Sequence, residues 1–369
     1  MRSIAHELAK LYPTQHKMPF DFSNVGFTGS LGSELAVGGW KELARYTSSG
    51  SSTLNVSSLP NRRYLMTLTS VPSLSTGATS RIRYNNVVGG TAKSTRLSYN
   101  GGADDSTSYI NADGMEGKNG SDTETGWFDI GYHVNYSTNE KLNMMWNVAQ
   151  STLGASTAPT RQERVSKQVL TNPIDRIEYF LASAGSYSSG CELVVLGYDP
   201  ADTHTTNFWE ELASVTSLTG GNVDSGTFTA KKYLWVQFEL IVNAYDSTNV
   251  VIQFNADTAG NYANRISQNG GADSTSVSQT SIATTVSGGK RIFGNMFIIN
   301  NSANEKLVIG HTVVIGTGAN STAEGAGVAP RRLEFVGKWA NTSNQITKIV
   351  LDDTLAGFVS GQIKVWGSN

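Results

Sequence analysis

The sequence predicts an all-β protein: two tandem antiparallel jelly-roll-type β-sandwiches preceded by an extended N-terminal arm with a short helix. Three observations lead to this fold class. Charged residues make up only 16% of the 369 residues, and polarity comes instead from Ser, Thr, Asn and 38 Gly. That composition favours short strands joined by turns, because the solvent faces of long helices need Glu, Lys and Arg. The other two observations are an internal repeat and an apolar alternation of period two.

The internal repeat is clearest in the stretch Asn100-Gly101-Gly102-Ala103-Asp104, which recurs letter for letter at 269–273. Further segments recur in the same order, at offsets between 165 and 171: Trp40-Lys-Glu-Leu-Ala with Trp209-Glu-Glu-Leu-Ala, Arg62-Arg-Tyr-Leu with Lys231-Lys-Tyr-Leu, Asn139-Glu-Lys-Leu with Asn304-Glu-Lys-Leu, Ala158-Pro-Thr-Arg with Ala329-Pro-Arg-Arg, and Ser189-Gly with Ser360-Gly. Seven collinear matches in all indicate a tandem duplication. Each unit is long enough to bury a core of its own. We expect domains at 40–198 and 208–369, joined by a polar linker at 199–207.

The alternation predicts the strands within each unit. Leu234, Val236, Phe238 and Leu240 are separated by polar or amphipathic residues, as in a strand with one face toward a core. Turn-forming residues bound such runs every eight to twelve residues or so, which predicts about eight strands per unit and a jelly-roll-type sandwich. The Asn-Gly pair of the repeated stretch predicts a type I′ hairpin turn in each unit.

Residues 1–39 lack this pattern. Ser3 can cap a short helix over 4–12, which Pro13 ends. The apolar side chains that follow have no period, so we interpret them as candidate subunit-anchoring residues of an arm: Phe20, Phe22, Phe27, Leu31 and Leu35. The arm could fold back on its own domain, cross a neighbouring subunit or remain disordered.

Bulk properties exclude several classes of partner. The net charge of −2 provides neither a basic footprint for nucleic acid nor a polybasic patch for an anionic membrane. We expect no membrane insertion, because no stretch approaches the roughly 18 apolar residues of a spanning helix. The N-terminus lacks the apolar region of a signal peptide, which predicts synthesis in a reducing cytoplasm, where the protein stays unless it leaves by another route such as lysis. The lone Cys191 excludes an intramolecular disulfide and is expected to be a buried thiol.

Motifs for chemistry are scarce. The sequence contains no nucleotide-binding glycine loop and no G-x-S-x-G nucleophile motif. Its five histidines are not spaced as metal ligands. We therefore predict a protein that is not an enzyme, with no cofactor and no metal site. The seven Trp could stack on sugars, but packing is the simpler interpretation.

One acidic loop, present only in the first unit, is the candidate for an external contact. Its carboxylates are Asp104, Asp105, Asp113, Glu116, Asp122 and Glu124. A solvated loop is the simplest interpretation of this cluster. A Ca²⁺ site and a pair of catalytic carboxylates are the alternatives.

The order of signals in each unit resembles a domain of tailed-bacteriophage virion proteins, the tail fibre or minor structural proteins. The residues that carry the resemblance are Trp209-Glu-Glu-Leu-Ala, Tyr233-Leu-Trp-Val-Gln-Phe, the Asn-Gly-Gly-Ala-Asp turn and Ser360-Gly-Gln-Ile-Lys-Val-Trp-Gly, with their counterparts from Trp40 onward. The resemblance implies a virion component attached to a capsid or tail through its arm, in a decoration or fibre role. It transfers no catalytic residues, because these domains share none.

The partners expected on this reading are other virion proteins and further copies of the chain, with a trimer favoured. The virion is the expected location. The alternative is a carbohydrate-binding adhesin of the tail that recognises a host surface glycan, and a glycan depolymerase ranks below it.

Overall fold

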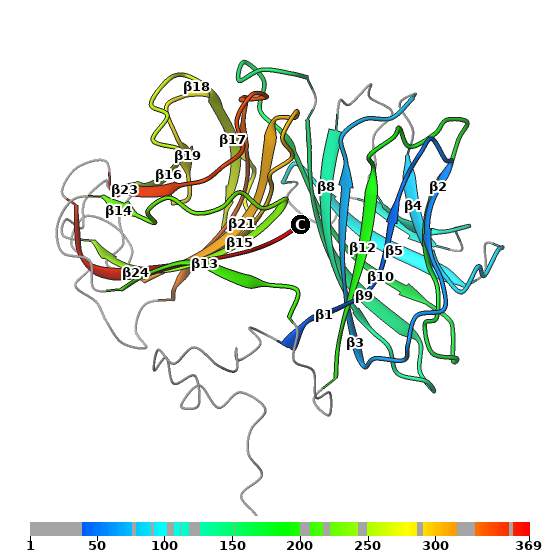
Figure 1. Cartoon of the computed structure of the whole chain (residues 1–369). Coiled ribbons are helices and arrows are strands. Elements are labelled where there is room, and N and C mark those ends of the chain that lie inside the picture. The colour runs from blue at the N-terminus through cyan, green and yellow to red at the C-terminus, as the bar shows by residue number, and fades with distance from the viewer. Residues whose placement is uncertain are drawn as a thin grey trace, which may run out of the picture.

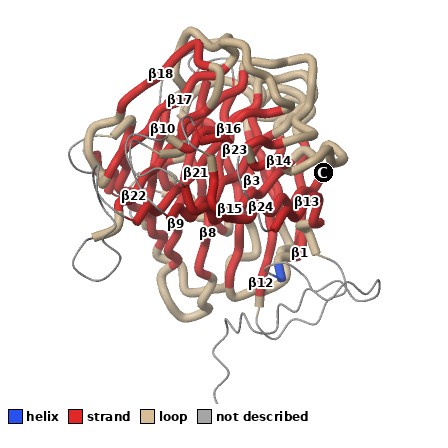
Figure 2. The backbone as a smooth tube through the Cα atoms, turned by 90° about the vertical axis from the view of Figure 1, so that its left-hand side faces the viewer, coloured by secondary structure: helices blue, strands red, loops and turns tan. Residues whose placement is uncertain are grey.

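The computed structural model describes residues 39–75, 79–89, 92–101, 107–110, 112–117, 126–150, 152–199, 207–216, 222–242, 249–285, 291–315, 329–353 and 357–369. Strands account for most of this part of the chain (Figure 2). The short helix expected near Ser3 and the rest of the arm up to residue 38 lie outside the described residues.

Twelve strands build the first sandwich. They are β1 (Lys41–Thr47), β2 (Thr53–Val56), β3 (Tyr64–Val71), β4 (Ser80–Tyr84), β5 (Lys93–Tyr99), β6 (Thr107–Ile110), β7 (Met115–Glu116), β8 (Gly126–Val134), β9 (Lys141–Gln150), β10 (Thr160–Gln168), β11 (Ile177–Leu181) and β12 (Glu192–Tyr198). Eight of them form a large antiparallel sheet in the order β1-β12-β3-β8-β9-β10-β5-β6, and four form a small sheet in the order β2-β11-β4-β7.

Twelve more strands build the second sandwich. They are β13 (Glu210–Thr216), β14 (Val223–Asp224), β15 (Tyr233–Val242), β16 (Val250–Phe254), β17 (Tyr262–Gln268), β18 (Ser274–Gln279), β19 (Ile282–Ala283), β20 (Arg291–Ile299), β21 (Lys306–Ile315), β22 (Arg331–Trp339), β23 (Ile349–Asp353) and β24 (Phe358–Ser368). The sheet orders are β13-β24-β15-β20-β21-β22-β17-β18 and β14-β23-β16-β19, so the two sandwiches have the same topology.

The fold class predicted from the sequence is therefore confirmed, but the expected number of strands was too low. Within the described residues each sandwich has twelve strands, where the turn spacing predicted about eight. Part of the excess consists of two-residue strands, β7, β14 and β19, which are too short to show an alternation.

A separate apolar core fills each sandwich between its large and its small sheet. In the second sandwich it contains Leu234, Val236, Phe238 and Leu240, all buried, as the alternation in β15 predicts. The core of the first sandwich includes Ile82 and Cys191, whose thiol is buried as expected. Burial raises the pKa of Cys191 to about 11.

The repeated Asn-Gly pair forms the turn that the sequence predicts. Asn100 and Gly101 have φ of 51° and 65°, and Asn269 and Gly270 have φ of 54° and 73°. Two successive positive φ values are the signature of a type I′ turn. In the second sandwich the Gly271 amide closes the turn on the Gln268 carbonyl at 2.9 Å.

The two sandwiches face each other through their large sheets. In Figure 1 the strands β15, β21 and β24 approach β8 and β9 at one end and turn away from them at the other. The C-terminus lies between the sandwiches, where the Asn369 carbonyl accepts a hydrogen bond from Arg45 at 2.6 Å. The surface between the large sheets is therefore the site where the two units meet.

Candidate functional site: the interface between the two sandwiches

The centre of the interface is a third apolar cluster, to which both sandwiches contribute. It contains buried side chains of the first sandwich, Met66, Leu68, Phe128, Ile130, Val148, Val194 and Leu196, and of the second, Tyr233, Phe297, Ile299, Leu307, Ile309, Val336 and Trp366. These residues alternate along their strands with residues of the two sandwich cores. The strands of the large sheets are thus apolar on both faces, which explains the near-continuous burial along β3 and β12.

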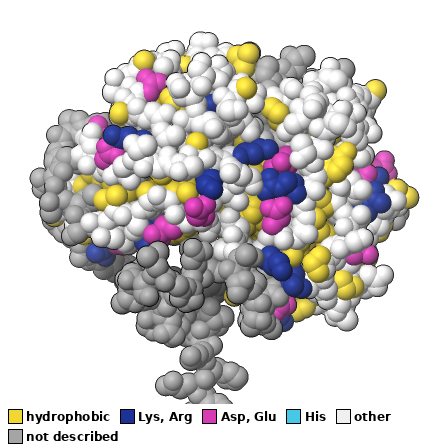
Figure 3. Space-filling view, viewed as in Figure 1, with side chains coloured by type: hydrophobic (Ala, Val, Ile, Leu, Met, Phe, Trp, Pro, Cys, Tyr) yellow, Lys and Arg dark blue, Asp and Glu magenta, His cyan; other side chains and the backbone are white. Residues whose placement is uncertain are grey.

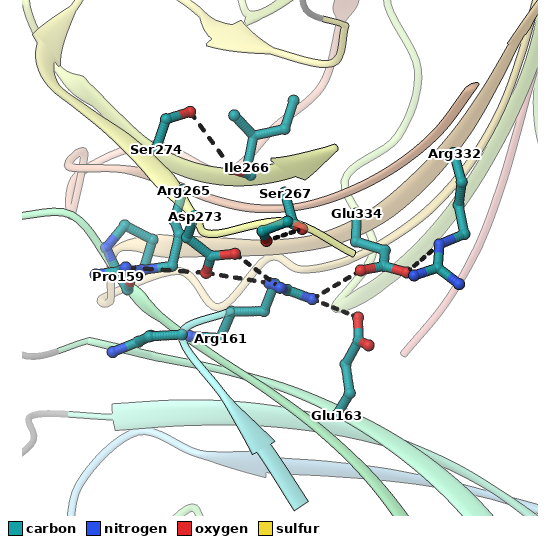
Figure 4. Close-up of polar contacts among 12 residues, drawn as sticks. Pro159, Arg161, Glu163, Arg265, Ile266, Ser267, Asp273, Ser274, Arg332 and Glu334 are labelled. Carbon is teal, nitrogen blue, oxygen red and sulfur yellow. Dashed lines mark hydrogen bonds and ion pairs between the residues drawn. The ribbon is translucent and has the colours of Figure 1, made fainter. Parts of the chain in front are cut away.

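A cluster of three guanidinium groups and three carboxylates borders this apolar centre (Figure 4). Arg161 of β10 donates to Asp273 at 2.8 Å, to Glu163 at 2.6 Å and to Glu334 of β22 at 3.1 Å. Arg332 pairs with Glu334 at 2.7 Å, and Arg265 lies 3.8 Å from Asp273. Positive and negative groups balance, so the charges are paired although several of them are buried.

Burial and pairing act against each other on these groups. Burial lowers the pKa of Arg161, but the hydrogen bond to Asp273 and the neighbouring carboxylates outweigh it, so the net shift is upward. Burial raises the pKa of Glu163 against the opposing charge of Arg161. The side chains here leave no cavity that would hold a water molecule. The arrangement is therefore suited to holding two surfaces together.

A second polar cluster lies at the edge where β1 and β12 meet the second sandwich. Glu192 accepts hydrogen bonds from Tyr233 at 2.7 Å and from Arg45 at 2.8 Å, and Lys232 lies 3.0 Å away. Burial would raise the pKa of Glu192, but the charge of Lys232 and the hydrogen bond from Tyr233 lower it. Figure 3 shows basic and acidic side chains together in the middle of this view, between the two sandwiches.

A third polar contact joins the ends of β9 and β21. Glu305 accepts hydrogen bonds from the Gln150 side chain and the Gly154 amide, and Lys338 donates to the Thr152 carbonyl at 2.8 Å. The interface thus combines an apolar centre with a polar border, the usual anatomy of a stable protein–protein contact.

Part of each large-sheet face is not covered by the other sandwich. On the first sandwich these uncovered residues are Leu142, Met144 and Val165, which we call the first open face. On the second they are Phe293, Val313 and Ile315, the second open face. Met144 pairs directly with Val165, and Phe293 with Val313, so each set is contiguous.

A row of aromatic rings adjoins the first open face. Trp146, Tyr132, Trp40 and Tyr198 contact one another in sequence, with ring centroids about 6 Å apart. All four are half-buried. Trp209 belongs to the interface cluster and its counterpart Trp40 packs against it, so neither lies in a sandwich core.

The candidate site residues from the sequence are mostly beyond the described chain. Phe20, Phe22, Phe27, Leu31 and Leu35 lie outside the described residues, and so do four carboxylates of the acidic loop: Asp104, Asp105, Asp122 and Glu124.

Two residues of the acidic loop are described, and they differ. Asp113 is exposed, as an external contact requires. Glu116 is buried in β7 and pairs with Arg81 at 3.0 Å, so the expectation of an external contact was wrong for this residue. A strand pairing that brings Glu116 beside Arg81 decides its environment, and loop composition does not reveal it.

The ion cluster is not evident from the sequence. Arg161 and Asp273 are 112 positions apart, and each belongs to a repeated segment with a sufficient local explanation. The repeated asparagine was a partial signal. Asn100 pairs with the Arg161 backbone, and Asn269 pairs in the same way with the Arg332 backbone. The turn therefore holds the start of the neighbouring strand in both units.

Two histidines are described. His133 is buried in β8, 2.9 Å from the Thr67 hydroxyl and 2.7 Å from that of Tyr84. His311 of β21 packs edge-on against Trp146. Within the described part of the chain, no three His, Cys, Asp or Glu side chains come together as a metal site would require. No described helix has the length and apolar character to span a membrane.

Comparison with known families finds no family model that matches the sequence, and no curated protein matches it either. Among solved structures, the chain is similar to domains LG4-5 of the mouse laminin α1 chain, with 10% identity over 92% of both chains and a TM-score of 0.16. It is also similar to Ail, the attachment invasion locus protein of Yersinia pestis, with 6% identity over 76% of this chain and 98% of that one, and a TM-score of 0.10. TM-scores this low bear on neither fold nor function.

Proposed function

We propose that the chain is a non-enzymatic structural protein of a tailed-bacteriophage virion, attached to the capsid or tail through residues 1–39, with its two sandwiches in a decoration or fibre role. The observation that supports a contact role is the pair of open faces, on which large apolar side chains remain exposed beside a large buried interface. Contiguous apolar patches on a folded surface mark sites of protein association. The resemblance of both units to domains of virion proteins is the reason for proposing a virion as the assembly to which the chain belongs.

Deleting residues 1–39 tests the attachment. We expect the truncated chain to keep the β-sheet circular dichroism of the full chain but to be absent from purified particles. A matched control is the full chain with Val88→Asp, an exposed loop substitution that should leave incorporation unchanged. Incorporation of the truncated chain at the level of the full chain would contradict an anchoring arm.

The second candidate is a carbohydrate-binding adhesin, and the half-buried aromatic row is the observation that favours it. Aromatic faces with adjacent polar groups are suited to sugar rings. On an array of host polysaccharides, the full chain should then bind and Tyr132→Ala should bind at least roughly tenfold more weakly, a loss of about 1.4 kcal/mol. Absence of binding at high protein concentration would exclude this candidate.

A further inference from the structure

The interface between the sandwiches is not symmetric, although the two units are repeats of each other. The strand ladders define which residues are equivalent: β9 corresponds to β21, β10 to β22, and β8 to β20. If the contact had two-fold symmetry, equivalent residues would be equally buried. They are not.

The first comparison concerns the end of each large sheet where β9 or β21 begins. At this end the second sandwich is covered and the first is open. Leu307 is 3% exposed, whereas its equivalent Leu142 is 55% exposed. The same holds for two neighbouring pairs, with the buried member first: Ile309 and Met144, Val336 and Val165. The first open face therefore consists of the counterparts of residues that pack in the interface.

At the opposite end of each large sheet, where β8 or β20 begins, the first sandwich is covered and the second is open. Phe128 is 1% exposed, whereas its equivalent Phe293 is 48% exposed. Val148 is buried in the interface, and its equivalent Val313 is exposed. The second open face is thus the counterpart of the surface that the first sandwich uses.

The charged border follows the same rule. Arg161 is buried among carboxylates, whereas its equivalent Arg332 is largely exposed. Lys338 is buried, whereas its equivalent Lys167 is half-exposed and pairs with Glu140, the equivalent of Glu305. In several of these pairs the residue type is identical, so chemistry is conserved between the units while burial is opposite.

This pattern is a heterologous contact, in which one surface of the first unit meets a different surface of the second. Such a contact leaves one unused copy of each surface, and repetition of it gives a ring or an open chain of subunits. The two open faces are those unused copies, because each consists of the equivalents of residues that are buried in the interface.

We propose that the second open face of one chain docks on the first open face of another copy of the same chain, repeating between molecules the contact that joins the sandwiches within one molecule. Phe293 and Val313 then pack against Leu142, Met144 and Val165 of the second copy. The inference does not depend on the proposed role in a virion.

The ion cluster provides the polar part of the same contact. Within one chain, Arg161 bonds Glu163 on its own strand and Glu334 on the other sandwich. Arg332 bonds Glu334 on its own strand, which is the equivalent arrangement. Its counterpart across the molecular boundary is Glu163 of the second copy.

The mass of the full chain in solution tests the proposal, by light scattering after size exclusion across a range of concentrations. The wild type should form species larger than the monomer. Val165→Asp disables the first open face, and Val313→Asp disables the second. Each should raise the dissociation constant by roughly 100-fold, because an unpaired carboxylate becomes buried. Val88→Asp, on an exposed loop and outside the residues that define the two faces, should assemble like the wild type.

Mixing the two variants distinguishes a heterologous contact from other modes. Val165→Asp keeps a working second face and Val313→Asp keeps a working first face, so their mixture should form a 1:1 pair and nothing larger. A wild type that is monomeric at every concentration would overturn the proposal. This is the result expected if residues 1–38 of the same chain, and not a second copy, covered the open faces. Failure of the mixture to pair, or assembly of either variant alone, would overturn it as well.

Discussion

Arg161 and Arg332 occupy equivalent positions in the two sandwiches and have opposite environments. Arg161 bonds three carboxylates, and its side chain and that of Asp273 are almost fully buried. Arg332 is largely exposed, and its guanidinium pairs with Glu334. Removing one partner from a buried ion cluster leaves uncompensated charge, whereas an exposed pair contributes little.

Arg161→Gln should therefore lower the free energy of unfolding by about 3 kcal/mol, and Arg332→Gln by less than about 1 kcal/mol. Urea unfolding followed by tryptophan fluorescence measures both. Equal effects of the two substitutions would mean that the cluster does not hold the sandwiches together.

A polar network in the core of the first sandwich has no counterpart in the second. The Tyr84 hydroxyl is hydrogen-bonded to the His133 ring at 2.7 Å and accepts a hydrogen bond from the Asn143 side-chain amide at 2.7 Å. The equivalent positions in the second sandwich are Ile298, Phe254 and Val308, all apolar and buried. The two units thus solve the same packing problem with different chemistry.

His133 makes stability depend on pH. Burial lowers its pKa to about 3, whereas an unfolded histidine titrates near 6.5. Between these values the unfolded chain binds one proton more, so stability falls as the pH falls through this window, by at most about 1.4 kcal/mol per pH unit. His133→Gln should remove this component, which urea unfolding at pH 7 and pH 5 would reveal as a smaller loss than in the wild type. An identical pH dependence in both proteins would contradict the assignment.

At the scale of elements, the repeated Asn-Gly turn has two functions. It sets the hairpin geometry. Its asparagine side chain also accepts a hydrogen bond from the backbone amide of an arginine on the strand beside it in the sheet, Arg161 of β10 or Arg332 of β22, at 2.9 Å in both units. Only in the first unit is the turn glycine also packed against the other sandwich. A Cβ on Gly101 would lie 2.0 Å from Asp273, whereas one on Gly270 would meet only the mobile end of Arg332 at 3.1 Å.

Gly101→Ala and Gly270→Ala separate these functions. Both glycines have positive φ, so each substitution costs roughly 1 kcal/mol of backbone strain. Gly101→Ala should cost about 1–3 kcal/mol more, because Asp273 must move from its place beside Arg161. Thermal unfolding of the two variants under identical conditions gives the difference, and equal melting temperatures would refute the contact.

At the scale of the molecule, the apolar cluster between the sheets couples the two sandwiches. Each has its own core, yet the cluster between them contains side chains of both. Separation would expose this surface to water. We therefore expect the sandwiches to unfold together, in one cooperative transition.

Val148→Asp should break this coupling, because it places a charge in the buried cluster at a cost of about 3 kcal/mol or more. Val313→Asp, at the equivalent exposed position, should change stability by less than about 0.5 kcal/mol in the monomer. Scanning calorimetry should show one transition for the wild type and Val313→Asp, and two for Val148→Asp. A single transition at unchanged temperature in Val148→Asp would argue against coupling.

Predictability differed between the fold and the site. The core face of β15 was predictable because a period-two pattern is local to one strand, and the type I′ turns were predictable because Asn-Gly tolerates positive φ. The pairing of Arg161 with Asp273 was not predictable, since it depends on how two complete sandwiches pack. Glu116 was misinterpreted because its partner Arg81 comes from another strand of the same small sheet, and this pairing is not visible in the composition of the loop.

The sequence by itself determined the all-β class, the duplication and the repeated turn, because side-chain alternation, collinear repeats and φ preferences are properties of short segments. The tertiary structure alone decided which copy of each repeated surface is buried. Leu142 has the same residue type as its equivalent Leu307, and Phe128 the same as its equivalent Phe293, so residue type does not distinguish the buried member from the exposed one. Only the packing of one large sheet on the other makes one member core and leaves the other exposed.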